Sequence, residues 1–423
     1  MIRSTLSNGL RIVVQPLSGM PSVGVAVHYD VGFRSELPGR SGFAHLFEHV
    51  MFQGSQHVAP ADHFRHVQAS GGTANGSTHQ DYTDFYQVVP ASALDRLLFL
   101  EADRMRSLRV TEETLRTQIA VVKEEIRQSV TDKPYGGFPW TVLPGVLYRE
   151  FRNAHNGYGT FEDLEAASLE ECQAFHETYY TPANAVLTIC GNVDPRRALD
   201  IADRHFGGIP ARPRPATPTL DEPEPAGERR REHRDRHAAL AATALGYRLP
   251  DPAASLPRYL SHMVLSHLLT GRESARLKRH TSRRAALMTD VSASCGLFGP
   301  LRARSPETLV VLAMHPPTTP VDTVLDLVDT ELADLASNGP TGTELPEGRA
   351  LASAGTWRGF DNLVVRTRAL GTYELLFEAA ELVDDLAPRL AAVTADDIRS
   401  AAAHLTRGKR AVLSLVTRKE VNR

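Results

Sequence analysis

Two histidines and a glutamate lie within five positions of an otherwise apolar stretch, SGFAHLFEHVMFQGS, at residues 41–55. If this stretch is helical, His45, Glu48 and His49 lie at positions i, i+3 and i+4 and project from one face of a single turn. Neutral imidazoles bind zinc well, and a catalytic zinc ion typically keeps three protein ligands and one open position. The spacing therefore predicts a zinc site with two histidine ligands, Glu48 beside the reacting water, and a third ligand from elsewhere.

The alternative is that these residues are three polar side chains on the side of a core helix. In a chain with 17 histidines, this five-residue pattern should arise by accident in roughly a few per cent of cases. The surrounding residues are apolar, and an apolar environment penalises polar groups that have no partner. A partner that satisfies all three residues is therefore expected.

The third ligand can be sought by helical phase in residues 111–130, TEETLRTQIAVVKEEIRQSV. The apolar stripe of this predicted helix consists of Leu115, Ile119, Val122 and Ile126. At about 100° per residue, Glu125 and Gln118 share a line along the flank of the stripe, whereas Glu124 points away from it. Glu125 is therefore the inward candidate. Without the histidine motif, both glutamates would be interpreted as surface acids of an amphipathic helix.

The composition indicates a globular protein with more than one domain. The chain has 423 residues, which at about 150 residues per domain suggests two to four units. A net charge of -3 argues against a nucleic-acid partner, and no apolar run approaches the roughly 18 residues of a membrane span. The opening MIRSTLSNGLRIVV lacks the apolar segment of a signal peptide, so we expect a cytoplasmic protein without a membrane partner. The three widely spaced cysteines are interpreted as buried or incidental thiols.

A proline-rich stretch divides the chain. Residues 211–228, ARPRPATPTLDEPEPAGE, contain five prolines and almost no large apolar side chains, which is typical of a linker. We therefore expect a zinc-binding lobe over residues 1–210, a linker over 211–234, and a homologous lobe without metal over 235–423. The basic run at the end of the linker is short and mixed with acids, which favours a solvated strand edge or linker end.

The two halves repeat one pattern. SLEECQAFHETYYTPANAVLTI, which begins at Ser168, aligns without a gap with TADDIRSAAAHLTRGKRAVLSL, which begins at Thr394. Each starts with a hydroxyl N-cap, has two acids in the first turn and ends in a β-rich A-V-L strand. Strand patterns at 11–17 and 22–32 are mixed with helical patterns such as 91–105. The predicted fold class is α+β, with two homologous lobes, each a mainly antiparallel sheet packed with helices.

The motif resembles that of the pitrilysin-type zinc metallopeptidases, the family of insulin-degrading enzyme and the mitochondrial processing peptidase. The family's inverted His-x-x-Glu-His motif is followed by a distant glutamate ligand, and His45, Glu48, His49 and Glu125 match this pattern. The segments HYDVGFRSE, GTFEDL and YYTPANAVLTICGNVD also resemble family segments in family order. The resemblance covers most of the first half specifically and the second half loosely.

The resemblance implies a role for each residue of the motif. His45, His49 and Glu125 would hold one Zn²⁺ ion per chain, and Glu48 would take a proton from the water that attacks the peptide carbonyl. Gln118 stands where many members have a second, supporting glutamate. This departure removes a charge, so the zinc affinity or the histidine orientation would depend on another group.

The stretch GGTANGSTHQDYTDFYQVV, residues 71–89, predicts a hairpin with two glycines at a turn. In the family, the first strand of this hairpin is a sheet edge to which an extended substrate adds as another strand. Asn75, Gly76 and Ser77 are therefore candidate substrate contacts. For most of the side chains, the alternative is an ordinary structural hairpin.

The second half lacks two expected donors. Complete family members carry an arginine and then a tyrosine that reach the substrate carbonyl and the developing oxyanion. Alignment of GRESARLKRHTSRRAALMTDVSAS places Ser282 and Thr289 at these positions, and a one-residue shift restores Arg283 but no tyrosine. Each such donor is worth about 10²-fold or more in rate. The resemblance therefore implies a heterodimer with a homologous subunit that supplies the arginine and the tyrosine.

The expected function is a zinc metalloendopeptidase that cleaves unstructured peptides, or leader segments of precursors, inside a closed chamber. The alternative is a non-catalytic scaffold like the core subunits of the respiratory ubiquinol-cytochrome c reductase, which share the fold. Those scaffolds have typically lost zinc ligands, whereas all the expected ligands are present here, and this favours the enzyme.

Overall fold

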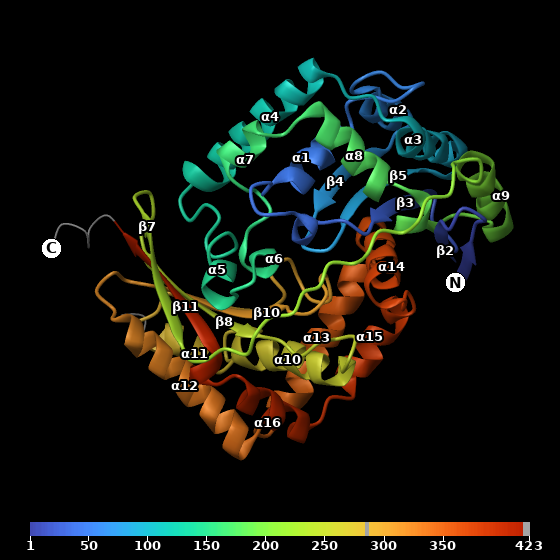
Figure 1. Ribbon diagram of the computed structural model, residues 1–423. Coiled ribbons are helices and arrows are strands. Elements are labelled where there is room, and N and C mark those ends of the chain that lie inside the picture. Colours follow the sequence, from blue (N-terminus) through green and yellow to red (C-terminus); the bar gives the residue numbers. More distant parts are fainter. Residues whose placement is uncertain (284–286, 418–423) are drawn as a thin grey trace. The chain divides into compact units, whose positions relative to one another are not determined.

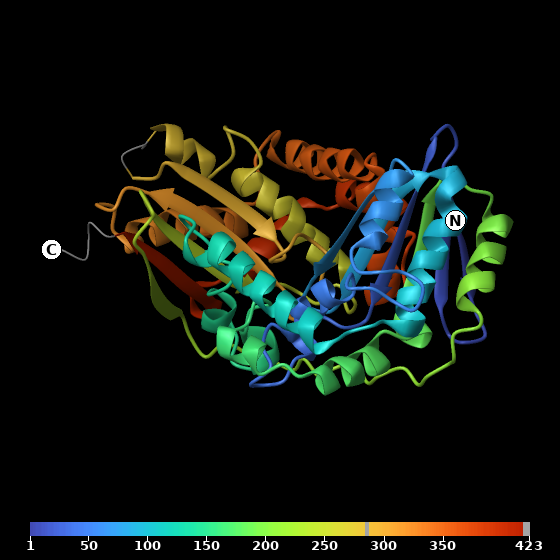
Figure 2. The same cartoon turned by 90° about the horizontal axis from the view of Figure 1, so that it is seen from above.

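The chain folds into two compact units, each built on one sheet (Figures 1 and 2). The computed structural model describes residues 1–283 and 287–417, with the backbone alone at positions 282 and 283. Unit 1 comprises Met1–Glu124, Gly157–Thr219 and Arg358–Asp384, and unit 2 comprises Glu125–Asn156, Leu220–Trp357 and Asp385–Arg423. None of the described helices is long and apolar enough to cross a membrane.

The sheet of unit 1 has six strands in the order β1-β2-β6-β3-β5-β4. They are β1 (Ile2–Thr5), β2 (Arg11–Pro16), β3 (Ser22–Tyr29), β4 (Thr73–Thr78), β5 (Thr83–Pro90) and β6 (Ala185–Gly191). All neighbours are antiparallel except β2 and β6. The central strands β3 and β6 are almost wholly buried, which matches their apolar runs. The strands predicted at 11–17 and 22–32 are confirmed. The hairpin predicted at 71–89 is present as β4 and β5, but its turn lies at residues 79–82, whereas the two glycines at 71 and 72 come between α2 and β4. β4 lies at the sheet edge.

The helices of unit 1 pack around this sheet. They are α1 (Phe43–Val50), α2 (Asp62–Ala69), α3 (Leu94–Ser107), α4 (Glu112–Ile126), α7 (Phe161–Glu165), α8 (Leu169–Tyr179), α9 (Pro195–Phe206) and α14 (Leu363–Phe377), with 3-10 turns at Phe33–Ser35, Ala91–Ala93 and Pro182–Asn184. α14 packs on β3 and β6. It approaches closely because Gly371 has no side chain: a Cβ there would lie 2.3 Å from Nδ1 of His28.

The sheet of unit 2 repeats the arrangement in the order β7-β11-β8-β10-β9. Its strands are β7 (Arg229–Asp235), β8 (Ala241–Arg248), β9 (Asp290–Cys295), β10 (Thr308–His315) and β11 (Arg410–Thr417). Its helices are α5 (Pro144–Leu147), α6 (Phe151–Ala154), α10 (Leu256–Thr270), α11 (Lys278–Arg283), α12 (Val321–Asn338), α13 (Glu344–Phe360), α15 (Leu382–Ala391) and α16 (Ala395–His404), with a π-helical turn at Arg127–Thr131 and a 3-10 turn at Arg407–Lys409. Figure 1 shows α10, α12 and α16 lying along this sheet.

The predicted duplication is confirmed by topology and by capping. The order β7-β11-β8-β10-β9 matches β2-β6-β3-β5-β4, and each sheet has one parallel pair. Ser168 and Thr394 both start their helices with a capping box, in which the hydroxyl and the carboxylate three residues later exchange hydrogen bonds with the backbone. The fold class is therefore α+β with two homologous, mainly antiparallel sheets.

The compact units differ from the division predicted at 1–210, 211–234 and 235–423. Residues 125–156 belong to unit 2, because buried side chains such as Leu143 join the core formed by β8, β10 and β11. Residues 358–384 belong to unit 1, because α14 covers its sheet. Each sequence half thus contributes one segment to the other sheet, which periodicity within a half cannot reveal.

The end of the predicted linker is also structured. Residues 229–234 form most of β7, which pairs in parallel with β11. The strand was not recognised because it lies at the sheet edge and most of its charged side chains are exposed. The linker between the two sheets therefore ends at residue 228.

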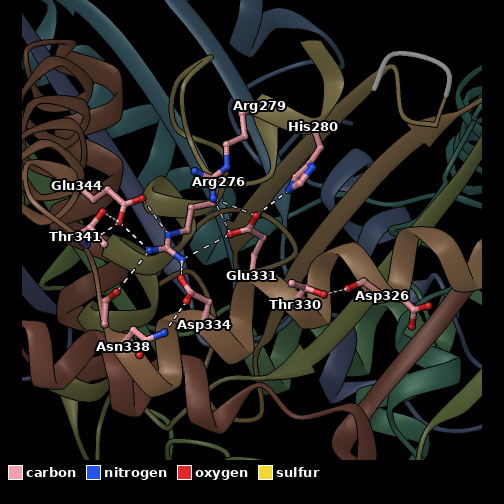
Figure 3. Close-up of polar contacts among 11 residues, drawn as sticks. Arg276, Arg279, His280, Asp326, Thr330, Glu331, Asp334, Asn338, Thr341 and Glu344 are labelled. Atoms are coloured by element: carbon pink, nitrogen blue, oxygen red, sulfur yellow. Dashed lines mark hydrogen bonds and ion pairs between the residues drawn. The ribbon is translucent and has the colours of Figure 1, made fainter. Parts of the chain in front are cut away.

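Unit 2 contains an ion-pair cluster around a buried arginine, shown in Figure 3. The Arg276 cluster consists of Arg276, Arg279, His280, Glu331, Asp334 and Glu344. The Arg276 side chain is 3% exposed and donates to Glu344 at 3.0 and 2.8 Å and to Asp334. Glu331 accepts from Arg279 at 3.0 and 3.1 Å and from His280 at 2.8 Å. These bonds tie α11 and the turn before it to α12 and α13.

Candidate metal centre

The histidine motif forms α1, whose start is held by a buried acid. The carboxylate of Glu36 accepts hydrogen bonds from the backbone N–H groups of Gly42 and Ala44, at 3.0 and 2.8 Å. A negative charge at a helix N-terminus is favourable because the first N–H groups have no partner within the helix. Gly42 has a φ of 82°, and a Cβ there would lie 2.4 Å from the carbonyl oxygen of Tyr158. This position therefore requires glycine.

The apolar face of α1 anchors the helix against α8. The rings of Phe43 and Phe47 each lie 5.0 Å from that of Phe175, and Phe47 lies 4.8 Å from Tyr180. Aromatic pairs at these distances add to the stabilisation from burial. Because this face is packed, the three polar residues of the motif project on the other side, where each is half-buried.

His45, His49 and Glu125 come together at one point. A ligand atom from each lies within 4.8 Å of those of the other two, and all three residues are half-buried. In the described part of the chain, no other group of three or more His, Cys, Asp or Glu residues meets in this way. The structure thus brings Glu125 to the histidines, while its neighbour Glu124 is exposed.

This group fits a zinc ion in donor chemistry and in size. Two imidazoles and one carboxylate form a donor set of catalytic zinc sites. The imidazole rings of His45 and His49 lie 5.0 Å apart and almost perpendicular, at 87°. Zinc–nitrogen bonds of about 2.1 Å place tetrahedral ligand atoms about 3.4 Å apart, so small side-chain movements suffice to close the group on an ion.

Gln118 is buried on the same helix as Glu125 and precedes it by seven residues, or about two turns. The shared flank predicted for the two residues is therefore present. The amide is neutral where many members of the resembled family have a glutamate. An amide side chain at this position adds no charge beside the group.

The carboxylate of Glu48 lies against the edge strand β4. Its Oε2 accepts a hydrogen bond of 2.8 Å from the hydroxyl of Thr78. A Cβ added to Gly76 would lie 3.0 Å from Oε1 and 3.1 Å from Cγ of Glu48. The missing side chain at this strand position therefore makes room for the glutamate.

The three candidate substrate contacts differ in their environments. Asn75 is exposed, and its Oδ1 accepts from the backbone N–H of Gly76 at 2.9 Å. Gly76 itself is buried. The hydroxyl of Ser77 donates to Oδ1 of Asp84 at 2.7 Å and also contacts Arg368. The side chain of Ser77 is thus engaged within the protein, which leaves its backbone for any contact with a peptide.

Arg368 on α14 supports this strand and was not found from the sequence. Its Nε and Nη2 donate to the two carboxylate oxygens of Asp84, at 2.6 and 2.9 Å, and its guanidinium lies 4.2 Å from the ring centroid of Tyr86. Burial alone would raise the pKa of Asp84, but the charges of Arg368 and then His28 hold it below the ordinary value. The two partners are 284 residues apart, so no local pattern could have paired them.

Thr289 and Ser282 occupy the positions aligned with the family's tyrosine and arginine. Thr289 donates from its N–H and from its hydroxyl to the carbonyl of Met314, at 2.8 and 3.1 Å. Ser282 lies in α11, and its side chain is outside the described residues, as is that of Arg283. The threonine hydroxyl is therefore engaged in supporting the start of β9.

The chain matches two models of one peptidase family. Residues 11–136 match the model described as "Insulinase (Peptidase family M16)", and residues 166–351 match "Peptidase M16 inactive domain". The residues matched by the second model do not include the histidine motif.

Several individual proteins are similar. Zinc protease PqqE of Helicobacter pylori is 31% identical over 257 residues, which are 58% of this chain and 56% of that protein. An uncharacterized zinc protease of Streptomyces coelicolor is 26% identical over 426 residues, covering 98% of this chain and 89% of the relative. Subunit 1 of the human mitochondrial cytochrome b-c1 complex is 26% identical over 257 residues, 59% of this chain and 53% of the subunit.

The fold is shared with solved structures. The crystal structure of a protease from Helicobacter pylori superposes with a TM-score of 0.88 at 23% identity, and the match covers 98% of this chain and 99% of the other. The two-sheet architecture is therefore common to both proteins.

Proposed function

The chain belongs to the M16 peptidase family, and from this premise we propose that it is a zinc-dependent endopeptidase acting on unstructured peptides or precursor leader segments. The observation that carries the proposal is the meeting of His45, His49 and Glu125, which come from two helices far apart in the sequence. In this proposal the three residues hold one Zn²⁺ ion per chain. The cytoplasm stays the predicted location.

The chain's own residues divide the remaining work. When bound, zinc supplies Lewis-acid chemistry, which polarises the peptide carbonyl and makes a water molecule more acidic. Glu48 takes a proton from the attacking water and passes it to the leaving amine. The packed face of α1 fixes the direction in which all three motif residues point, which is necessary because positioning of the base contributes strongly to rate.

In this proposal, the edge strand β4 binds the peptide substrate. An extended peptide can pair with an open sheet edge through backbone hydrogen bonds, which requires no particular sequence but does require an unfolded segment. Asn75, Gly76 and Ser77 lie on this strand, beside the carboxylate of Glu48. We therefore place the scissile bond along β4, inside a chamber closed by the protein.

The proposal includes a homologous partner subunit. The positions that correspond to the family's arginine and tyrosine hold Ser282 and Thr289. Each missing donor to the developing oxyanion is worth about 10²-fold or more in rate. A heterodimer in which the partner supplies both groups would restore this activity.

A scaffold role is the second candidate, and it is favoured by one observation. Subunit 1 of the cytochrome b-c1 complex is 26% identical to this chain over 257 residues. The intact His45, His49 and Glu125 group weighs against a role without catalysis, because a scaffold needs no metal ligands.

The test is peptide cleavage by the zinc-loaded chain, alone and mixed with a homologous subunit from the same source. A mixed library of unstructured peptides is the substrate, and Glu48→Gln is the control that leaves the zinc ligands intact. We expect cleavage that depends on Glu48 and rises by at least 10²-fold with the partner. Zinc binding without any Glu48-dependent cleavage, alone or with the partner, would favour the scaffold.

A further inference from the structure

We propose that Thr78 is a positioning residue, whose hydroxyl fixes the carboxylate of Glu48 relative to the strand on which the peptide docks. This inference rests on the proposed peptidase function. It concerns a residue that neither the histidine motif nor its spacing identifies. Contacts on both faces of β4 support this role.

One face of β4 contacts Glu48. Thr78 donates from Oγ1 to Oε2 of Glu48 at 2.8 Å, and Gly76, two residues earlier on the same face, leaves the space that Oε1 and Cγ occupy. The carboxylate is thus located by a donor at one oxygen and by close backbone approach at the other. Both contacts come from the strand that would pair with the substrate.

On the other face, β4 is held to the rest of unit 1. Ser77 donates to Asp84 of the neighbouring strand at 2.7 Å, and Arg368 of α14 contacts both residues. Asp84 and Arg368 form a buried pair with two nitrogen–oxygen contacts. A hydrogen bond from the adjacent Thr78 therefore comes from a strand with little freedom to move.

Threonine suits this role for a physical reason. A glutamate has three side-chain torsions, so without a fixed donor its carboxylate can adopt several orientations. The β-branched Thr78 has restricted χ1 freedom in a strand, so its hydroxyl stays directed at α1. Loss of the hydroxyl should leave peptide docking intact and reduce the fraction of complexes in which Glu48 is aligned with the attacking water.

The variants Thr78→Val and Thr78→Ser separate this role from general stability. Valine keeps the shape and removes the donor, whereas serine keeps the donor. Thr83→Val is the matched control, because Thr83 is the register partner of Thr78 on β5 and donates to the carbonyl of Val31 at 2.9 Å instead. Zinc content, melting temperature, kcat and KM are measured for each zinc-loaded protein, in the presence of the partner subunit.

We expect Thr78→Val to lower kcat about tenfold, with KM and zinc content unchanged, and Thr78→Ser to recover most of the rate. Thr83→Val should lower the melting temperature and keep the wild-type kcat. An unchanged kcat in Thr78→Val, a rise in KM alone, or equal losses in the valine and serine variants would overturn the proposal.

A second measurement does not depend on activity. Crystal structures of the zinc-loaded wild type and Thr78→Val should show one carboxylate position for Glu48 in the wild type and a displaced or divided one in the variant. The same single position in both would refute the positioning role. If wild type and Glu48→Gln are equally inactive, the peptidase proposal fails, and the crystal structures still decide what Thr78 does.

Discussion

In the first half of the chain, β3 leads through a 3-10 turn into α1 and its half-buried histidines, whereas in the second half β8 leads into α10 and a buried histidine. The two sheets have the same strand order, so these helices occupy comparable places. Nδ1 of His262 on α10 lies 2.7 Å from the carbonyl of Arg258, and its Nε2 lies 3.2 Å from a ring nitrogen of His404. The same topology therefore uses imidazoles as candidate ligands in one half and as internal hydrogen-bonding groups in the other.

The charged clusters of the two halves differ in the same way. The metal group joins a carboxylate with two imidazoles, whereas the Arg276 cluster joins carboxylates with two guanidinium groups and one imidazole. A guanidinium is always charged and has no acceptor, so it neutralises acids and excludes a cation. A neutral imidazole can offer a lone pair to a metal. The nature of the basic partner thus separates a ligand site from a structural one.

The largest effect is expected from the Arg276 cluster. Arg276→Met leaves Glu344 and Asp334 without the cation that joins them, whereas Glu331 keeps Arg279 and His280. Breaking a buried ion pair costs about 3 to 5 kcal/mol, and because Asp334 is 45% exposed we expect a loss of about 3 kcal/mol. Urea unfolding measures the loss. Arg389→Met is the control, since Arg389 and Asp385 are both half-exposed and such pairs contribute about 0 to 1 kcal/mol. Equal losses in the two variants would contradict a structural role for the cluster.

Glu125 and Glu124 provide a matched pair on one helix. Glu125→Gln should weaken zinc binding by about 100-fold or more, because even outer partners of ligands change affinity by about 10- to 100-fold. Glu124→Gln should bind zinc as the wild type does, since Glu124 is exposed. Competition with a zinc chelator gives both affinities. If Glu124→Gln lost more zinc affinity than Glu125→Gln, the ligand would have been assigned to the wrong face of α4.

A smaller effect is expected from Gln118. Gln118→Glu adds a negative charge to a buried position about two turns before Glu125, and it should raise zinc affinity about tenfold. The same chelator competition measures it. Unchanged or weaker binding would show that the amide is already the better supporting group in this chain.

The smallest expected effect is on the pH dependence of stability, and it comes from His262 in the second half. Burial, together with the charges of His404 and Arg258, lowers the pKa of His262 to about 4. In the unfolded chain this histidine has an ordinary pKa near 6.5 and therefore binds a proton more readily than in the folded chain. The free energy of unfolding is therefore highest above about pH 6.5 and falls as the pH drops towards 4. Between pH 7 and 5.5 this group should account for about 1 kcal/mol. Urea unfolding of His262→Gln should show a shallower decline; an unchanged decline would exclude His262 as its source.

Much of the arrangement could be predicted because it depends on local patterns. The spacing of His45, Glu48 and His49 required only one helical turn, and the phase of α4 correctly separated the inward Glu125 from the exposed Glu124. The capping residues Ser168 and Thr394 were found because a capping box spans four residues.

The unpredicted features depend on contacts between distant segments. Arg368 meets Asp84 across 284 residues, and Thr78 meets Glu48 across 30. The exchange of residues 125–156 and 358–384 between the sheets has the same origin, because tertiary packing decides which sheet a helix covers. The edge strand β7 was missed because strands with exposed faces lack the alternation that identifies half-buried ones.

The most direct test is an anomalous diffraction measurement at the zinc absorption edge on crystals of the zinc-loaded chain. We expect one peak about 2.1 Å from a nitrogen of His45, a nitrogen of His49 and a carboxylate oxygen of Glu125, and no peak in the second half. A zinc peak elsewhere in the chain, with no peak beside these three residues, would contradict the proposed metal site.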